Sequence, residues 1–402
     1  MSGLLNGIRV IEIASERSAF AGKLMADFGA DVVLVEPPNG HTTRTYEPFL
    51  EDVPGPDRSL FFWHYNTSKT NVVLDLTLAN DRSRFVELVA GADVVLESED
   101  PGYLALMGID HVHLRPTNER LVWTSVTPFG RSGPRANEPA SDITLMASGG
   151  IAWNCGYDDH SLPPVAGSGH QAFHTGSLYA VMSTLTALVH RDVSGVGQFV
   201  DVNINAAVNV TTEAGSYEWL VAQATVQRQT CRHAAVHPSS ASLATAADGK
   251  IVHTGVPPRG KREFEALAGW MRDLGVDGDY EEFFFLEMGV ERGGVNLSEL
   301  SGNAEVQAIF GAGREGLRFL AERLTSREFF MQAQSRGLSV GVLNAPEDVM
   351  ADPHFAARGF HVDVEHAELG RSFVYPGLPF KGTAAGGEIR RAPVLNGSMA
   401  AD

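Results

Sequence analysis

Cysteine is scarce in this sequence, and its scarcity excludes a fold held together by disulfide bonds. Two cysteines, Cys155 and Cys231, occur in 402 residues, and they form neither a disulfide framework nor the paired spacing of a zinc site. The chain also lacks an apolar stretch of the roughly 18 residues that a membrane span requires. Its first residues lack the basic region and apolar run of a signal peptide. We therefore expect a cytoplasmic protein with no metal ion and no membrane partner.

Basic residues are also fewer than acidic residues. The chain carries 31 Lys and Arg residues against 49 Asp and Glu residues, for a formal net charge of -18. A nucleic acid needs a basic binding face, so we expect no nucleic acid as a partner. A phosphorylated small molecule needs only a local group of cations and donors, and it stays compatible with this composition. A dinucleotide is disfavoured, because the first strand-to-helix turn has no Gly-x-Gly-x-x-Gly.

Short apolar runs alternate with helical patterns in the first half of the chain. Residues 8–13 predict a strand, 18–28 a helix and 30–36 a second strand, which together form a βαβ unit. The same alternation continues with strands at 71–76, 93–97 and 121–126 and a helix at 80–90. Consecutive units of this kind place their strands parallel in one sheet. The predicted fold class is therefore a doubly wound α/β domain.

The pattern changes after residue 205. Residues 206–240 begin with a helical pattern and continue without a clear period, which is typical of a linker. A second, smaller α/β domain is predicted at 241–345, with helices at 261–274, 304–323 and 326–336. Thr325 and Glu328 have the spacing of a capping box for the last of these helices. Gly311 and Gly313 are expected to break the middle one.

One stretch in the middle of the chain combines glycine, histidine and a strongly apolar helix. It runs from Ser168 to Gly176, continues in a helix at 178–189, and leads through Gly195-Val196-Gly197-Gln198 into a strand at 199–204. The helix carries apolar residues on nearly every side, so we expect it to be buried. His170 and His174 precede it at a spacing that puts both side chains on one face of a helical turn.

This stretch resembles the middle of the class III CoA-transferases, the CaiB/BaiF family. Further blocks that are similar to the family follow one another in the family's order. They lie at 5–12, 26–38, 66–76, 125–134, 351–360 and 376–380. The resemblance implies a Rossmann-like large domain at 1–205, a small α/β domain at 241–345 and a return of 346–402 to the large domain. It also implies a ring-shaped subunit that interlocks with a second copy as a homodimer.

The activity implied by this resemblance is the transfer of CoA from an acyl-CoA to a small carboxylic acid, with CoA as the acyl carrier. In the family an aspartate carboxylate attacks the thioester, and CoA then returns to form a thioester with the enzyme. In this sequence the aspartate position falls on Ala172 or Phe173, depending on a one-residue gap. Neither side chain can form an anhydride. The nearest acidic residues upstream, Asp158 and Asp159, belong to a stretch that predicts a solvated turn.

Three interpretations of the missing carboxylate are open at this point. The chain is a CoA-transferase with a displaced nucleophile, an acyl-CoA racemase or isomerase that transfers protons, or a non-catalytic paralogue that binds acyl-CoA or a related partner subunit. The racemase branch of the family uses a histidine that falls near Ser141, beside Asp142, and an aspartate near Ala172, so its pair is missing as well. Imidazole titrates near neutral pH and suits acid–base catalysis. We therefore name His170 and His174 as the candidate catalytic residues.

Four residues are candidates for contacts with CoA. Arg44, Thr67 and Lys69 lie in or beside blocks that meet the nucleotide in the family, and cations and hydroxyls suit phosphate. Ser98 opens the segment 98–102, which stands where the family has Asn-Phe-x-Pro-Gly and which brings two carboxylates into the expected neighbourhood of phosphate. The aromatic run 61–65 fits either an adenine or acyl pocket or ordinary core packing.

Overall fold

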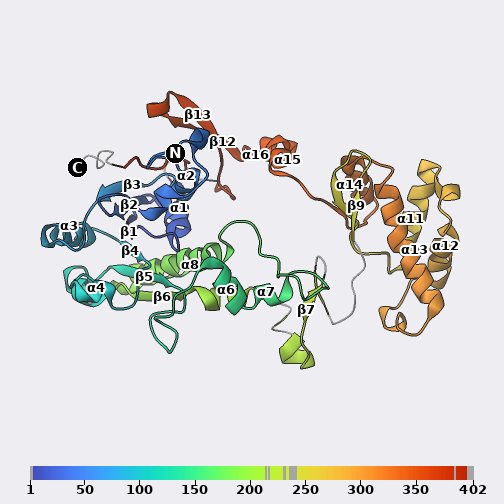
Figure 1. Ribbon diagram of the computed structural model, residues 1–402, viewed down its shortest axis with the longest axis horizontal. Coiled ribbons are helices and arrows are strands. Elements are labelled where there is room, and N and C mark those ends of the chain that lie inside the picture. Colours follow the sequence, from blue (N-terminus) through green and yellow to red (C-terminus); the bar gives the residue numbers. More distant parts are fainter. Residues whose placement is uncertain are drawn as a thin grey trace. The chain divides into compact units, whose positions relative to one another are not determined.

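The protein divides into two compact units in a computed structural model of the chain (Figure 1). The structure describes residues 3–212, 215, 218–229, 232–234, 242–383 and 386–395. The large unit comprises Met1–Pro238 and Pro353–Asp402, and the small unit comprises Ser239–Asp352. The domain boundaries at 205, 240 and 345 stay predictions, and part of the predicted linker lies outside the described residues. Two separate segments of the chain thus build the large unit.

A parallel six-stranded sheet forms the centre of the large unit. Its strands are β1 (Arg9–Ile13), β2 (Asp31–Glu36), β3 (Thr70–Val73), β4 (Val94–Glu97), β5 (Val122–Thr127) and β6 (Phe199–Asn203). They stand in the order β3-β2-β1-β4-β5-β6, and every neighbouring pair is parallel. This confirms the predicted α/β class with a Rossmann-like sheet. The strand order reverses between β1 and β4, and ligands of such sheets bind at the carboxyl ends of the strands beside the reversal.

Helices and two short antiparallel pairs complete the large unit. The helices are α1 (Ala19–Asp27), α2 (Leu60–Tyr65), α3 (Ala79–Ala90), α4 (Tyr103–Leu106), α5 (His111–Leu114), α6 (Asp142–Ser148), α7 (Ile151–Asn154), α8 (Gln171–Ser194), α9 (Ile204–Val210) and α16 (Pro353–Arg358). The antiparallel pairs are β7 (Gln227–Gln229) with β8 (Arg232–Ala234), and β12 (His361–His366) with β13 (Arg371–Pro376). Across both units, no helix in the described ranges is long and apolar enough to cross a membrane.

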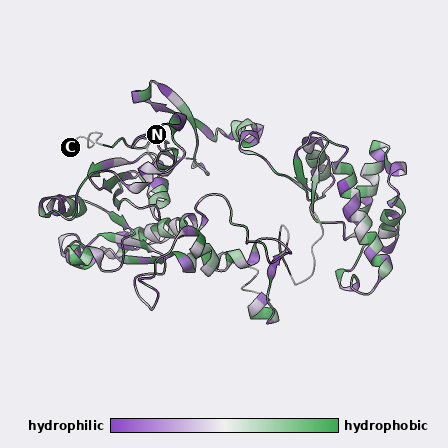
Figure 2. Ribbon diagram, in the orientation of Figure 1, coloured by the Kyte–Doolittle hydropathy of each residue, from purple (hydrophilic) through white to green (hydrophobic). Residues whose placement is uncertain are grey.

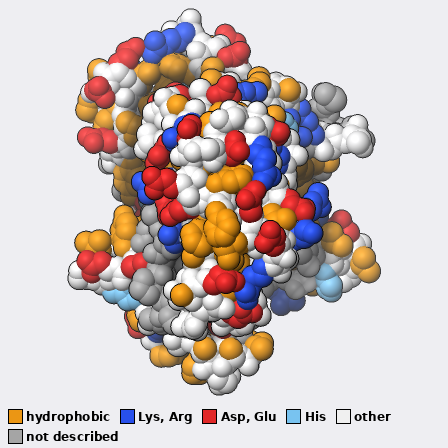
Figure 3. Space-filling model, turned by 90° about the vertical axis from the view of Figure 1, so that its right-hand side faces the viewer, with side chains coloured by type: hydrophobic (Ala, Val, Ile, Leu, Met, Phe, Trp, Pro, Cys, Tyr) orange, Lys and Arg blue, Asp and Glu red, His pale blue; other side chains and the backbone are white. Residues whose placement is uncertain are grey.

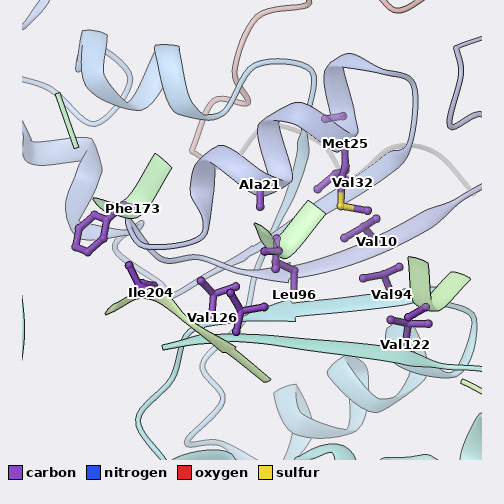
Figure 4. Close-up of a cluster of buried hydrophobic side chains, with 14 of the residues drawn as sticks. Val10, Ala21, Met25, Val32, Val94, Leu96, Val122, Val126, Phe173 and Ile204 are labelled. Atoms are coloured by element: carbon purple, nitrogen blue, oxygen red, sulfur yellow. The ribbon is translucent and has the colours of Figure 1, made fainter. Parts of the chain in front are cut away.

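Both faces of the sheet are covered, and its inner strands contribute buried apolar side chains to a core on each face. Hydrophobic residues along the strands are green in Figure 2. On one face, α1, α6 and α8 share a core with the strands, and Figure 4 shows Ala21 and Met25 of α1 near Val10 and Val32. The other face packs against α3, whose Phe85 belongs to a second core. The start of α8 is thereby fixed against the sheet.

One side of helix α8 differs from the sequence-based expectation. The prediction of burial on every side was wrong, because α8 packs on the sheet through one side while the opposite side faces outward. Its outward stripe consists of four apolar side chains that are 54% to 89% exposed. These are Leu178, Met182, Val189 and Val193, which we call the α8 stripe. An apolar surface of this kind is typical of a face that another chain covers.

The small unit packs helices against a three-stranded antiparallel sheet. Its strands are β9 (Leu243–Thr245), β10 (Ile251–His253) and β11 (Gly341–Val342), in the order β11-β10-β9. Its helices are α11 (Lys261–Leu274), α12 (Phe283–Arg292), α13 (Ala304–Ala321), α14 (Ser326–Ser335) and α15 (Pro346–Ala351). The face of this unit in Figure 3 intersperses acidic and basic side chains with apolar ones.

Two sequence features of the small unit have different outcomes in the structure. Thr325 and Glu328 form the predicted capping box at the start of α14. The expected break at Gly311 and Gly313 was wrong, since α13 continues through both glycines. A Cβ on Gly313 would lie 3.1 Å from Cδ of Pro258. This glycine therefore allows α13 to pack closely against Pro258, and it does not end the helix.

Candidate functional site

The two candidate histidines lie together at the start of α8, against an aromatic group. The Nε2 atom of His174 and the hydroxyl oxygen of Tyr65 share a hydrogen bond of 2.7 Å. The ring centroid of Phe20 lies 4.5 Å from that of His174, and the ring centroid of Phe61 lies 5.2 Å from that of His170. We call these five residues the histidine–aromatic cluster. The aromatic run 61–65 therefore contributes to this cluster as well as to the core, where Phe62 and Trp63 are buried.

The first turn of α8 takes its cap from another helix. The N-cap residue His170 makes no side-chain capping hydrogen bond, and α8 has no acidic residue in its first turn. Instead Asp142, the first residue of α6, accepts a hydrogen bond at its Oδ1 from the backbone N–H of Phe173 at 2.9 Å. The N–H groups of a first helical turn lack partners within the helix and attract negative charge. Asp142 thus places a half-buried carboxylate beside the cluster.

The two positions that replace the expected aspartate belong to the protein core. Ala172 is 0% exposed and Phe173 is 2% exposed, and both pack in the core shared by α8 and the sheet. Figure 4 shows Phe173 in this core. The ring of Phe173 stacks on that of His170 with centroids 5.6 Å apart. A charge at either position would have to be desolvated, and the apolar side chains remove that cost.

The Tyr65–His174 pair is uncharged near neutral pH. Burial lowers the pKa of His174, the charge of His170 acts in the same direction, and the carboxylate of Asp142 opposes them. Burial also raises the pKa of Tyr65, and the Asp142 carboxylate adds to that rise. A neutral imidazole hydrogen-bonded to a neutral phenol can accept or pass on a proton. The Nδ1 atom of His170 is buried and has no hydrogen-bond partner among the described residues.

His64 precedes Tyr65 of this cluster, and the effect of its burial on its pKa can be tested. Burial, with smaller effects from the charges of Lys23 and His174, lowers the pKa of His64 to about 4. The unfolded chain takes up this proton near pH 6.5, so the folded state loses stability as pH falls from about 6.5 towards 4. We expect His64→Gln to remove about 2–3 kcal/mol of that loss. Guanidinium unfolding between pH 4 and 8 measures it, and the same change at the exposed His190 serves as the control. Parallel profiles for His64→Gln and the native protein would contradict the expectation.

Lys69, a candidate for CoA contact, is buried in an ion pair. Its side chain and that of Glu12 are both 0% exposed, and the Lys69 Nζ lies 2.8 Å from Oε2 of Glu12. The ammonium also donates to Oε1 of Glu12, to the carbonyl of Ala19 and to Oδ1 of Asn66, at 2.9–3.0 Å. An ammonium has three N–H donors, and each has an internal acceptor. The phosphate contact of Lys69 stays a prediction.

The other three candidates for CoA contact also have internal partners. The guanidinium of Arg44 donates to both carboxylate oxygens of Glu36 at 2.7 Å, and to Asp57 and two backbone carbonyls at 2.8–3.1 Å. The hydroxyl of Thr67 accepts from Lys23 and donates to Asp27, and the hydroxyl of Ser98 donates to the carbonyl of Val126. All three residues are at most 4% exposed. Their contacts with CoA stay predictions.

A cleft beside the Lys69 block contains two arginines, of which Arg390 is exposed and Arg391 is partly buried. It has a volume of about 320 Å³ and is lined by residues 68–71 and 390–394. The guanidinium of Arg390 donates to the carbonyl of Ser68, and the guanidinium of Arg391 pairs with Glu368. Within the part of the chain that the structure describes, no group of His, Cys, Asp and Glu side chains has the arrangement of a metal site.

Sequence reasoning did not name Tyr65 or Asp142 as site residues. Tyr65 lies 109 positions from His174, and Asp142 lies 31 positions from Phe173. Local spacing carries no information on such contacts. The available signals were the position of Tyr65 at the end of the aromatic run and that of Asp142 beside Ser141, where the histidine of the racemase branch falls.

Comparison with known proteins gives one family. A sequence model of CoA-transferase family III matches residues 5–282 and 289–398. The chain is 31% identical over 373 residues to the succinyl-CoA:(R)-benzylsuccinate CoA-transferase subunit BbsE of Thauera aromatica, covering 93% of this chain and 87% of that protein. It is 30% identical over 385 residues to the succinate–glutarate CoA-transferase of Agrobacterium fabrum, covering 93% and 88%. The crystal structure of a CaiB/BaiF family protein from Brucella suis is similar with a TM-score of 0.78 and 25% identity, covering 98% of this chain and 97% of that one.

Proposed function

Because the chain belongs to CoA-transferase family III, we propose that it transfers CoA from an acyl-CoA donor to a small carboxylic acid. The observation that carries this proposal is the extent of the family match, which includes segments of both units and the start of α8. The names of the relatives pair succinyl-CoA with (R)-benzylsuccinate and succinate with glutarate. We therefore propose succinyl-CoA as donor and a dicarboxylic acid as acceptor.

An exchange reaction tests this function without knowledge of the acceptor. Incubation with succinyl-CoA and 13C-labelled succinate should move the label into succinyl-CoA, because the acid released from a donor can serve as an acceptor. Mass spectrometry of the CoA ester measures the exchange, and a sample without protein is the control. Glutarate, mesaconate and oxalate are tested as further acceptors, and formyl-CoA is tested as a further donor. Absence of both exchange and transfer with every pair would contradict the proposal.

We place the nucleotide end of CoA in the cleft lined by 68–71 and 390–394. This cleft joins the backbone of the predicted CoA-binding block to Arg390 and Arg391, which lie nearer the surface than the buried Lys69. Ser68 lies three positions after Tyr65 in the chain, a span of at most about 11 Å, so the cleft lies close to the histidine–aromatic cluster. Guanidinium groups suit phosphate through paired, charge-assisted hydrogen bonds.

Removal of one of these arginines should weaken CoA binding. Arg390→Ala is expected to reduce the affinity for CoA by about 1–2 kcal/mol, the scale of one charge-assisted hydrogen bond. Titration calorimetry measures the change. Arg58→Ala is the matched control, because Arg58 forms a partly exposed pair with Glu51 elsewhere in the large unit. Equal CoA affinities for Arg390→Ala and Arg58→Ala would place the nucleotide elsewhere.

We propose an interlocked dimer as the assembly. The α8 stripe supports this proposal, because a second chain that covers it would remove four exposed apolar side chains from water. A second copy of the chain or a related subunit would cover the stripe equally, and the relative from Thauera aromatica is named as a subunit. Sedimentation of the purified chain at nanomolar concentration separates the cases, since a folded monomer would rule out an interlocked homodimer.

A second candidate function is proton transfer at the α-carbon of an acyl-CoA. The uncharged Tyr65–His174 pair favours it, because a neutral imidazole is able to accept a proton from carbon. This function would exchange the α-proton of an acyl-CoA in deuterated water, and His174→Gln would abolish the exchange. A chain with neither proton exchange nor CoA transfer would be a non-catalytic subunit.

A further inference from the structure

We infer that the carboxylate of Asp142 is the nucleophile that accepts CoA in this chain. The inference rests on the proposed CoA transfer, whose covalent route needs a carboxylate of the enzyme. The Oδ1 of Asp142 accepts the N–H of Phe173 at 2.9 Å. That N–H belongs to the peptide group that joins Ala172 to Phe173. The carboxylate of Asp142, on α6, therefore reaches the position on α8 where Ala172 and Phe173 supply no carboxylate.

The carboxylate of Asp142 lies beside the histidine–aromatic cluster. Asp142 is half-buried, and α6 packs against α8 in one core. The negative charge of Asp142 adds to the burial that raises the pKa of Tyr65, and it opposes the burial that lowers the pKa of His174, so it acts on the two groups of the 2.7 Å hydrogen bond. The buried Nδ1 of His170, which lacks a partner among the described residues, is a second polar atom at this end of α8. It is suited to a hydrogen bond with the oxygen of a thioester.

Other carboxylates near the cluster are less suitable. Glu16 accepts a hydrogen bond at 2.9 Å from the hydroxyl of Tyr46, whose ring lies 5.1 Å from that of Phe61. Asp158 and Asp159 are exposed. Asp142 has one oxygen held by the helix, and within the described residues its Oδ2 has no hydrogen bond. A fixed carboxylate with one free oxygen is prepared for attack on an acyl group.

CoA transfer through Asp142 takes four steps. The Asp142 carboxylate attacks the thioester carbonyl, which forms a mixed anhydride and releases the CoA thiolate. The thiolate attacks the Asp142 carbonyl, which gives an aspartyl-CoA thioester and frees the donor acid with one oxygen from Asp142. The acceptor carboxylate attacks this thioester and releases the thiolate again. The thiolate then attacks the acceptor carbonyl, so the acceptor leaves as its CoA ester and one acceptor oxygen stays on Asp142.

The oxygen transfer provides a test on the native protein. Succinyl-CoA and succinate labelled with 18O in both carboxylates are incubated with the native chain, which is then digested and analysed by peptide mass spectrometry. The peptide with Asp142 should gain 2 mass units per oxygen, up to 4 after several turnovers. Exchange of 13C between succinate and succinyl-CoA is followed in the same sample, so that failure of the transfer is distinguished from failure of the assignment.

Matched variants supply the second measurement. Asp142→Asn keeps an oxygen acceptor for the Phe173 N–H but removes the nucleophile, and we expect CoA exchange to fall about 1,000-fold or more. Its affinity for succinyl-CoA and its unfolding midpoint should stay close to the native values, which separates the loss from misfolding. Asp159→Asn, in an exposed turn, should retain native exchange.

The outcomes separate the two proposals. Label on Asp142, together with loss of exchange in Asp142→Asn, supports the inference. Exchange with label on Glu16 or another peptide, or with no labelled peptide, overturns the assignment while leaving CoA transfer intact. Absence of all exchange removes the proposed function and the inference with it.

Discussion

Lys69→Ala should lower the free energy of unfolding by about 3–5 kcal/mol, the scale of breaking a buried ion pair by removing one partner. The side chains of Lys69 and Glu12 are both fully buried. Burial raises the pKa of Glu12 and lowers that of Lys69, while their mutual attraction opposes both shifts. Without Lys69 the carboxyl of Glu12 would keep its burial and lose its counter-charge. Guanidinium unfolding of the native and variant chains measures the difference.

A double variant separates the ion pair from simple loss of packing. Lys69→Met combined with Glu12→Gln removes both charges and keeps similar volumes, so it should recover most of the stability lost by Lys69→Ala. Glu12→Ala is a less suitable partner, because it would also create a cavity. Stability of Lys69→Ala within 1 kcal/mol of the native chain would show that the pair contributes little.

The same variants decide between two roles for Lys69. A residue that contacts phosphate through its ammonium should lose CoA affinity in the double variant even when stability is restored. The internal acceptors of all three N–H groups lead us to expect unchanged CoA affinity for the folded double variant. Calorimetry with CoA provides the measurement, and a loss comparable to that of Arg390→Ala would restore the role that the sequence predicts.

The sheet could be predicted from the sequence because its signals are local. Continuous apolar runs predict buried parallel strands, and short helical patterns between them predict crossovers. The outward side of α8 could not be predicted, because apolar residues such as Leu178 and Met182 are expected both in a core and at an interface with a second chain. The path of α13 through Gly311 likewise depends on packing partners that the local sequence does not contain.

The candidate site was predicted in part, for the same reason. His170 and His174 share one turn, so their proximity follows from spacing alone. The partner of His174 comes from α2 and the cap of α8 comes from α6. The ion-pair partner of Lys69 lies 57 positions earlier in the chain. A family motif identifies Lys69 as a cation in a particular block, but only the folded chain gives that cation Glu12.

Arg44→Ala should lower the free energy of unfolding by about 3–5 kcal/mol. Glu36 and Arg44 are 0% and 1% exposed, and Arg44 holds Glu36 through two parallel hydrogen bonds of 2.7 Å. The remaining N–H groups reach Pro56, Asp57 and Pro393, so all five guanidinium donors are used. Loss of Arg44 would release the loop at 56–57 and the segment at 393 from β2. Arg44→Lys should also destabilise, because one ammonium cannot reproduce the paired geometry.

The pH dependence of this loss identifies its cause. Burial acts to raise the pKa of Glu36, but the hydrogen bonds and charge of Arg44 outweigh it, so the pKa is lowered from 4.5. In the native chain this carboxylate stabilises the fold above pH 4.5, and that contribution is lost as pH falls through its lowered pKa. In Arg44→Ala burial would raise the pKa of Glu36, so protonation would relieve the unpaired charge. The stability deficit should therefore be smaller at pH 5 than at pH 8, as measured by guanidinium unfolding. A deficit that does not change with pH would assign the loss to the loop contacts instead. Arg120→Ala, at an exposed pair with Asp192, should cost less than about 1 kcal/mol at either pH.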